Sequence, residues 1–271
     1  KDPVSALPPS ATVRWTAPDA NGDANLTYQL RQVGSTKILY SGTGLSTNVT
    51  LAVSTGDQQF EVTAENKAGV SQWSPASNAV RGWQVPGPVT GLAVTPTGSD
   101  NTAKITFGAA NGNGALPSEL TYYWAANGVT QQIPSGGATV TNGAFVDGEN
   151  ASVAVYAVAR VDGESAQGES TSATVNTYGP PVSPSMSCGV GGTSISCSWS
   201  GGDGNGRTTS YALSGDATGA VGPTGSYPFG DVGYSATRTL CIQATQNTGV
   251  QGARNCDAKT SDPMPRHPSQ R

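Results

Sequence analysis

The side chains that could do chemistry in this chain are few and lie in separate places. All four cysteines fall in the last third of the 271-residue sequence, at Cys188, Cys197, Cys241 and Cys256. Oxygen donors recur at every second position near the N-terminus, at Asp19, Asn21, Asp23 and Asn25. The only histidine is His267, which stands between Arg266 and Pro268. These three groups of residues limit the reactions and ligands that the sequence permits.

Catalysis is not expected from these residues. A Ser-His-Asp triad or a histidine-based metal site needs an imidazole held by a packed scaffold, whereas His267 lies in a proline-rich stretch without a strand pattern. Glycosidases need only two carboxylates, but the 18 acidic residues are scattered through predicted turns and solvent-facing strand positions. We therefore predict that the protein is not an enzyme and needs no cofactor.

The alternating oxygen donors of residues 19–25 resemble the start of a calcium-binding EF-hand loop. The rest of that motif is missing, because the glycine required at its sixth position is Ala24 and the glutamate at its twelfth is Leu30. Incomplete motifs match sequences often, so we favour a polar loop without a metal. The loop remains a candidate binding site, with a weak calcium contact as the alternative.

The cysteines predict two disulfides. Their spacing is not C-x-x-C and no histidine is near, which argues against zinc and redox catalysis. An even number of cysteines in one small unit indicates disulfides formed in an oxidising compartment. Cys197 alternates in phase with Trp199, which points it inward near Cys188. Cys241 is out of phase with its apolar neighbours, which points it outward toward the strand of Cys256. Of the three possible pairings, this phase favours Cys188–Cys197 with Cys241–Cys256 and opposes a Cys197–Cys241 bridge.

The elements that carry these residues repeat along the chain. Trp15, Phe107 and Trp199 stand 92 residues apart, and each ends an alternating run and opens a turn-forming one. A tyrosine follows each of them after 12 to 15 residues, at Tyr28, Tyr122 and Tyr211. Equal spacing of this size marks an array of similar domains. The chain is predicted to contain three copies of one β module.

Strand patterns and joints define the predicted organisation. Period-two alternation dominates, which places one side of each strand in a core and the other in water, and no amphipathic helical stretch of ten residues occurs. We predict an all-β chain of three sandwiches in an extended array, covering residues 1–83, 84–178 and 179–262 (units one, two and three), with a proline-rich tail over 263–271. The joints are proline-rich and should be stiff, with little contact between units and a total length approaching about 100 Å.

The three units resemble fibronectin type III domains over nearly all of the chain. That family has a core tryptophan on its second strand, followed by a proline and an Asn-Gly loop, as at Trp15, Pro18 and Asn21-Gly22. Its sixth strand reads apolar-x-apolar-x-Ala-x-Asn-x-x-Gly, as in the run from Phe60 to Gly69. The corner tyrosine of the family is replaced by Gln58 in unit one and by Arg238 in unit three. The resemblance implies seven-stranded, immunoglobulin-like sandwiches whose corners are held by other contacts.

The resemblance and the composition together lead to a functional expectation. The sequence is rich in Gly, Ala, Ser, Thr and Asn and has few Lys. In this composition it resembles secreted or surface proteins of bacteria, in which such domains serve as spacers. We expect a non-catalytic extracellular spacer or stalk within a larger protein, acting as a monomer. The alternatives are an adhesion module that binds an unidentified protein or polysaccharide at the cell surface, or accessory domains of a carbohydrate-active enzyme.

The charge and hydropathy of the chain argue against two kinds of partner, nucleic acids and membranes. The formal net charge is −4 and only 12% of residues are charged, so no basic surface for nucleic acid is expected. No run approaches 18 apolar residues, and we expect no insertion of this segment into a membrane.

Two further expectations concern aromatic residues and core size. Tyr123 should face away from Tyr122 and Trp124, as a single exposed aromatic that could stack on a sugar. Trp73, in a Ser-Gln-Trp-Ser stretch that resembles half of the WSXWS element of cytokine receptors, should be ordinary packing because no arginine ladder faces it. Unit three is glycine-rich, and its core is predicted to be the smallest.

Overall fold

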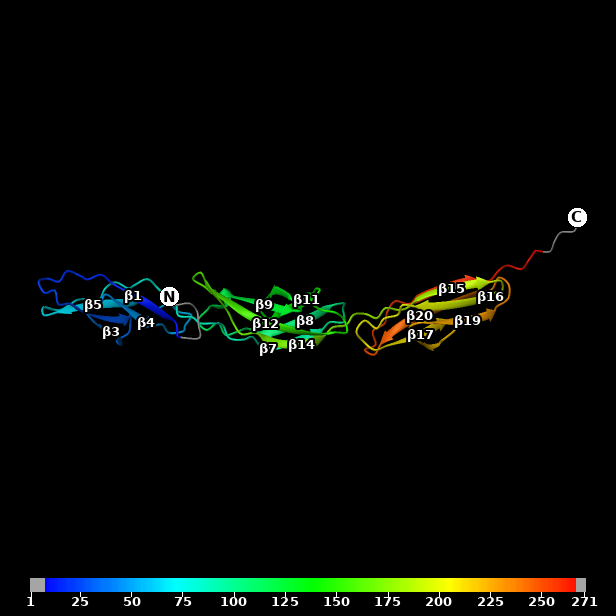
Figure 1. Cartoon of the computed structure of the whole chain (residues 1–271), viewed down its shortest axis with the longest axis horizontal. Coiled ribbons are helices and arrows are strands. Elements are labelled where there is room, and N and C mark those ends of the chain that lie inside the picture. Colours follow the sequence, from blue (N-terminus) through cyan, green and yellow to red (C-terminus); the bar gives the residue numbers. More distant parts are fainter. Residues whose placement is uncertain (1–7, 267–271) are drawn as a thin grey trace.

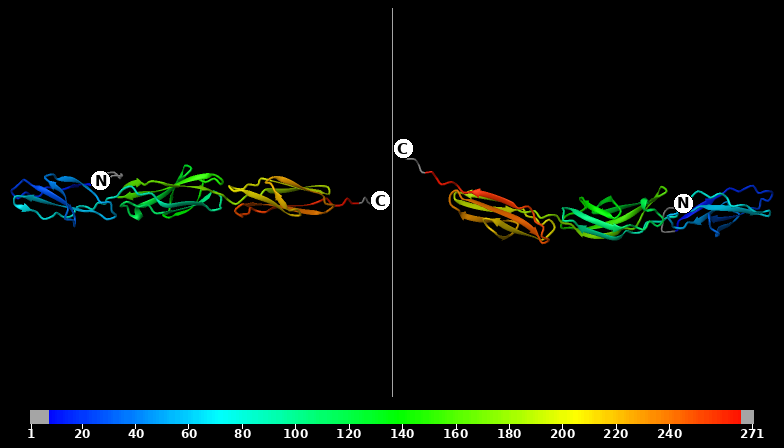
Figure 2. Two further views of the ribbon diagram at one scale, coloured as in Figure 1. Left: turned by 90° about the horizontal axis from the view of Figure 1, so that it is seen from below. Right: turned by 180° about the vertical axis from the view of Figure 1, so that it is seen from behind.

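The computed structural model describes residues 8–266 and is all-β over that range, apart from one short 3-10 turn. The strands form three sandwiches that follow one another along a single long axis (Figure 1). Two further views show the same extended outline, without folding back of one sandwich onto another (Figure 2). The predicted fold class is confirmed.

Unit two contains a three-stranded sheet and a five-stranded sheet. The first has the order β11-β8-β7, built from Gly137–Thr141, Thr102–Gly108 and Thr90–Pro96. The second has the order β10-β9-β12-β13, built from Val129–Ile133, Leu120–Ala126, Asn150–Val161 and Glu164–Gln167. Strand β14 (Thr171–Asn176) also pairs with β12, and the 3-10 turn η1 (Pro117–Glu119) precedes β9. All these pairings are antiparallel.

Unit three repeats this arrangement. Its three-stranded sheet has the order β15-β16-β19, built from Ser185–Gly191, Ser194–Ser200 and Gly225–Asp231. Its four-stranded sheet has the order β18-β17-β20-β21, built from Gly219–Val221, Thr209–Gly215, Thr237–Gln246 and Asn255–Thr260.

Unit one has one strand fewer on its smaller sheet within the described residues. That sheet consists of β1 (Ser10–Arg14) and β4 (Ser46–Thr50) alone. The larger sheet has the order β3-β2-β5-β6, built from Ile38–Gly42, Thr27–Gln32, Phe60–Asn66 and Gly69–Val70. Its corner is held by Gln58, whose side-chain amide bonds both the N–H and the carbonyl of Ala52. Contacts other than a tyrosine hold this corner, as predicted.

The cores differ in size, and in a different order from the one predicted. The buried cluster of unit two is the largest of the described residues, with Trp124 and Phe145 stacked inside it. Unit three buries a cluster that includes Trp199, Tyr211 and Cys197, whereas the buried cluster of unit one contains only Leu30, Val49, Leu51 and Phe60. The prediction that unit three has the smallest core is wrong, because glycine content is a poor guide to the large side chains and cystine that fill it.

Both disulfides predicted from strand phase are confirmed. Cys188 and Cys197 face each other across β15 and β16, and Cys241 and Cys256 face each other across β20 and β21. The first bridge belongs to the buried cluster of unit three. In the second, Cys241 is outside that cluster and Cys256 is exposed, so this bridge lies on the other face of its sheet.

A carboxylate ties the last strand of unit three to the first. Asp257 of β21 accepts the N–H of Cys188 of β15 at 2.8 Å. This backbone hydrogen bond holds the pKa of the Asp257 carboxyl below its ordinary value, and Lys259, with its Nζ at 3.6 Å, acts in the same direction. The ionised carboxylate therefore stabilises the sandwich edge.

We expect reductant to destabilise unit three selectively. Each disulfide in a small domain contributes about 2–4 kcal/mol, and the other two units contain no cysteine. Calorimetry of the whole chain should show one transition moving to lower temperature with reductant and the rest unchanged. Melting of all three units at unaltered temperatures would contradict this prediction, as would a mapped Cys197–Cys241 peptide.

We also expect unit three to lose stability in acid through Asp257. A carboxyl whose pKa is lower in the folded state stabilises fully above its unfolded pKa of about 3.9, and that contribution disappears as pH falls toward the folded pKa. Thermal unfolding between about pH 5 and pH 2 should show a smaller acid dependence in Asp257→Asn than in the unchanged chain. Identical pH profiles for the two proteins would refute the assignment.

Candidate functional site

Each of the two joints between neighbouring units is built around one copy of a repeated loop. The sequence Asp/Asn-x-Asn-Gly follows the core aromatic of every unit, beginning at Asp19, Asn111 and Asp203. In each copy the first side chain accepts the N–H of the Asn two residues on, at 2.9–3.0 Å. That Asn has a positive φ in all three copies, at Asn21, Asn113 and Asn205. Only Gly and a few residues such as Asn adopt this conformation readily.

In the first joint, the loop of unit two holds the linker that enters it. The side chain of Asn113 donates to the carbonyl of Val85 at 2.7 Å, and its own carbonyl accepts the N–H of Gln84 at 2.8 Å. Gly114 lies against the carbonyl of Gly82 so closely that a Cβ atom would collide with it. The loop and the linker therefore fit as backbone against backbone.

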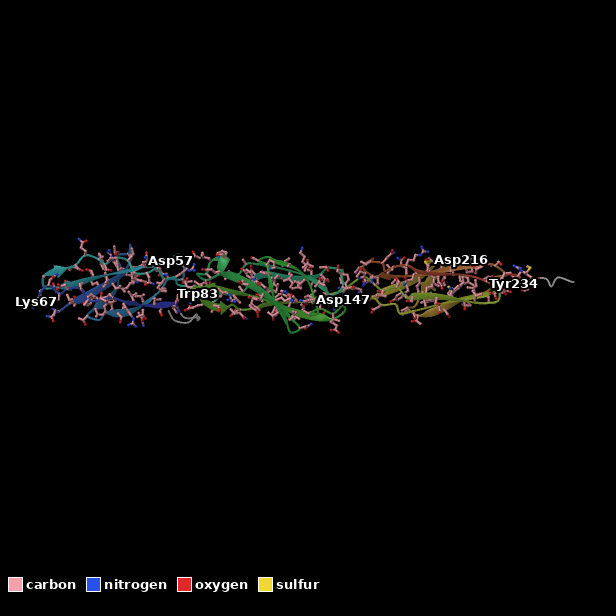
Figure 3. The ribbon with its side chains drawn as sticks, turned by 90° about the horizontal axis from the view of Figure 1, so that it is seen from above. Asp57, Lys67, Trp83, Asp147, Asp216 and Tyr234 are labelled. Carbon is pink, nitrogen blue, oxygen red and sulfur yellow. A yellow bond between two sulfur atoms is a disulfide. The ribbon has the colours of Figure 1, made fainter. Side chains whose placement is uncertain are left out.

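An apolar contact and an ion pair complete the first joint. Trp83 is 1% exposed and packs against Ala115, Ala159 and Val161 of unit two. It lies between the first two sandwiches (Figure 3). Arg81 forms a salt bridge with Glu119 of η1. Because Arg81 is itself buried, this ion pair fixes the approach of the two sandwiches.

The second joint uses the same loop with different side chains around it. The side chain of Asn205 donates to the carbonyl of Pro180 at 3.1 Å and to Asp100 of unit two at 2.7 Å. Arg207 bonds the side-chain oxygen of Asn176 at 2.8 Å and lies over the ring of Tyr178, 4.1 Å from its centroid. Such a cation–π contact contributes about 0.5–2 kcal/mol.

These contacts correct one expectation. The units lie in an extended array as predicted, but the expectation of little contact between them is wrong, because both joints are packed and hydrogen-bonded. The signal was present in the sequence, since the Asp/Asn-x-Asn-Gly loops recur with the same 92-residue spacing as the core aromatics.

The predicted binding loop of unit one uses its oxygens internally. Asp19 accepts the N–H of Asn21, and Asp23 accepts the N–H groups of Asn25 and Lys67. The backbone N–H of Asn25, followed by that of Lys67, holds the pKa of the Asp23 carboxyl below its ordinary value. Between residues 8 and 266, no three His, Cys, Asp or Glu side chains are arranged to hold a metal ion. The geometry is that of a self-bonded turn.

Tyr123 has a partner that sequence reasoning missed. It stands opposite Tyr156 in the β9–β12 pair, and the two rings are stacked with centroids 5.6 Å apart and planes 16° apart. Both are partly exposed. The two residues are 33 positions apart in the sequence, and only the strand register brings them together. The outer face of unit two therefore carries an aromatic pair rather than a single ring.

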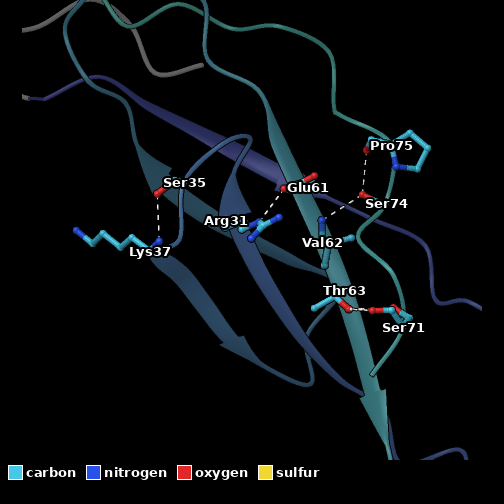
Figure 4. A network of polar contacts seen from close by, with 9 residues as sticks. All are labelled: Arg31, Ser35, Lys37, Glu61, Val62, Thr63, Ser71, Ser74 and Pro75. Atoms are coloured by element: carbon cyan, nitrogen blue, oxygen red, sulfur yellow. Dashed lines mark hydrogen bonds and ion pairs between the residues drawn. The ribbon is translucent and has the colours of Figure 1, made fainter. Parts of the chain in front are cut away.

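The edge of β5 in unit one is covered by serine hydroxyls (Figure 4). Serines at every third position of segment 71–77 meet every second residue of β5. Each serine Oγ accepts one backbone N–H, at 3.0–3.1 Å, in the pairs Ser71–Ala64, Ser74–Val62 and Ser77–Phe60. The segment thus satisfies the strand edge without forming a regular ladder.

Trp73, within the same segment, does meet an arginine. The guanidinium of Arg31, from β2, lies 3.9 Å from the ring centroid and also bonds Glu61 at 2.7 Å (Figure 4). A single arginine forms no ladder, but it was not expected, because the expectation rested on the side chains of β5 and Arg31 comes from the neighbouring strand β2.

His267 lies outside the described residues. No helix among residues 8–266 is long and apolar enough to cross a membrane.

Replacing Trp83 with alanine should loosen the first joint. Truncating a buried tryptophan costs about 3–5 kcal/mol, and this cost falls on the contact between units rather than on either core. Small-angle scattering of Trp83→Ala should show a broader distribution of shapes and a smaller mean dimension than the unchanged chain. Trp73→Ala, in the same unit but away from the joint, is the control. A scattering curve of Trp83→Ala that superimposes on that of the control would refute the role of Trp83.

No family model and no curated protein matches the chain. Among solved structures, the FN1–FN3 domains of chicken CNTN1 are similar, with 14% sequence identity, a TM-score of 0.34, and coverage of 94% of this chain and 95% of that chain.

Proposed function

We propose that this segment is a stiff, non-catalytic extracellular spacer within a larger surface or secreted bacterial protein. The observation that carries the proposal is the repeated loop, which docks on the preceding linker at both joints with the same Asn-Gly geometry. A stiff link acts through the distance and orientation it enforces. When a domain is attached to the end of a stiff link, the effective concentration of that domain rises only at the distance that the link spans.

The chemistry of the chain supports an extracellular setting. Two disulfides within one small sandwich are typical of proteins from oxidising compartments. A surface with few charges carries no long-range attraction for nucleic acid. The spacer therefore holds its neighbours apart without recruiting charged partners.

The spacer function should depend on length and stiffness rather than on one surface. In the protein that carries this segment, deleting unit two should shorten its reach by about a third. Replacing residues 81–88 by Gly and Ser, which removes Arg81 and Trp83 from the first joint, should keep the contour length but remove the stiffness. We expect both changes to reduce function, and Tyr234→Ala on the surface of unit three to leave it intact. Full function after the linker replacement would exclude a stiff spacer.

The Tyr123–Tyr156 pair favours a second candidate function, the binding of a neutral polysaccharide. Aromatic rings bury large apolar area at little entropic cost and suit flat ligands. The neighbours of the pair on β9, β10 and β12 are uncharged: Thr121 and Ala125 on β9, Gln132 on β10, and Ala154 and Val158 on β12. Amide and hydroxyl groups can bond sugar hydroxyls without repelling an uncharged chain.

Pull-down on insoluble polysaccharides tests this candidate. The double variant Tyr123→Ala/Tyr156→Ala should lose about tenfold or more of any binding, because alanine removes both rings, a loss near 1.4 kcal/mol. Tyr234→Ala, which removes an exposed ring from unit three, is the matched control. Equal retention of the double variant and the control would rule out this face as the binding site.

A further inference from the structure

Asparagine followed directly by glycine is a chemically labile pair, and the chain contains several of them. The backbone nitrogen of the glycine can attack Cγ of the asparagine side chain, because glycine has no side chain to hinder the approach. The reaction is intramolecular, so proximity and freedom of rotation decide its rate. The six pairs begin at Asn21, Asn111, Asn113, Asn127, Asn142 and Asn205.

Left-handed turns restrain four of the six pairs. Their asparagines, at positions 21, 113, 127 and 205, have φ between 45° and 47°. The ring formed by the attack contains the Cα–C bond of the asparagine, and the rotation about that bond that closes the ring is not the one found in such a turn. Three of the four also donate an Nδ2 hydrogen bond to a backbone carbonyl, Asn113 to Val85, Asn127 to Ala144 and Asn205 to Pro180.

Packing of the first joint restrains the fifth pair. The backbone carbonyl of Asn111 accepts the N–H of Gly87 at 2.8 Å, and its side chain accepts the N–H of Asn113 at 2.9 Å. Gly112 lies so close to the carbonyl of Ala115 that a Cβ atom would be 2.3 Å from it. Rotation of the peptide between Asn111 and Gly112 would therefore disrupt the contact with the linker.

Asn142, directly after β11, has fewer restraints. It is not among the described residues with positive φ, and its Nδ2 is buried without a hydrogen-bond partner among residues 8–266. Gly143 is exposed, and a Cβ atom placed on it would have no atom within 4 Å. The bonds that oppose rotation are local, from the N–H of Ala144 to the side-chain oxygen at 2.8 Å and from the N–H of Phe145 to the backbone carbonyl at 3.3 Å. The departing amide nitrogen therefore breaks no hydrogen bond.

We propose that Asn142 is a site of spontaneous deamidation. The backbone nitrogen of Gly143 loses its proton to base and forms a bond to Cγ of Asn142. The bond from Cγ to Nδ2 then breaks, and Nδ2 leaves as ammonia after taking up a proton. Water opens the resulting succinimide at either carbonyl carbon, which yields aspartate or isoaspartate at position 142.

The modification would act on the core of unit two. Isoaspartate carries the backbone through the side chain and so lengthens it by one carbon atom just before Ala144 and Phe145, which are 0% and 2% exposed. Phe145 is stacked on Trp124, with ring centroids 5.7 Å apart. Aspartate instead places a charged oxygen where the buried Nδ2 lies, and burial of an unpaired charge is unfavourable. Either product destabilises unit two and limits the lifetime of the folded array.

Peptide mapping by mass spectrometry tests the site on the intact, folded chain. The protein is kept in mildly alkaline buffer at physiological temperature, and deamidation is followed over time at all six pairs. Asn142 should react about tenfold faster than each of the other five, a margin that corresponds to one hydrogen bond or turn that need not be broken. The same measurement in guanidinium, where the turns are absent, should give similar rates at all six.

Gly143→Ala is the matched variant, because the site has room for a methyl group and no left-handed conformation. It should slow deamidation at position 142 by about tenfold in the folded chain and leave the other pairs unchanged. After ageing, the unchanged chain should contain isoaspartate at position 142 and melt at lower temperature in unit two, whereas aged Gly143→Ala should do neither. Folded-state deamidation at Asn142 no faster than at the other pairs, or the same preference for Asn142 in guanidinium, would overturn the proposal.

Discussion

The extended shape of this protein depends on one backbone conformation, the positive-φ Asn-Gly turn that ends the loop after each core aromatic. At Gly114 and Gly206 the turn approaches the preceding unit so closely that a Cβ atom would collide with backbone atoms of Gly82 or Gly148. A side chain at either position would push the sandwiches apart. The Asn before each glycine supplies the hydrogen bond that holds the linker. The same few atoms therefore determine both the conformation of the loop and the orientation of one unit relative to the next.

The side chains around this turn differ between the joints, although the frame is shared. The first joint excludes water with Trp83 and neutralises Arg81 with Glu119. The second uses polar contacts, in which Arg207 joins Asn176 and the ring of Tyr178. Burial of an aromatic and a cation–π contact resist bending by different means. The repeated frame tolerates this variation because the Asn side chain bonds backbone carbonyls of the linker, which are present whatever the side chains around them.

The sequence was sufficient for features that depend on local periodicity. Alternation with period two revealed the strands, and the phase of Cys197 and Cys241 revealed both disulfides, because a strand has only two faces. Features that depend on register or on packing between units were missed. Tyr156 is 33 residues from Tyr123, and Arg31 reaches Trp73 from a different strand. The size of each core was misjudged for the same reason, since large side chains such as Trp199 and Tyr211 come together only in the folded sandwich.

The central claim is that packed joints make the three sandwiches one stiff body, and residual dipolar couplings test it most directly. Amide couplings are measured for each unit of the intact chain in one aligned medium, and an alignment tensor is fitted to each unit separately. Stiff joints predict tensors of the same magnitude, rhombicity and orientation for all three units. Tensors that differ in magnitude from one unit to the next would show independent motion and contradict the account.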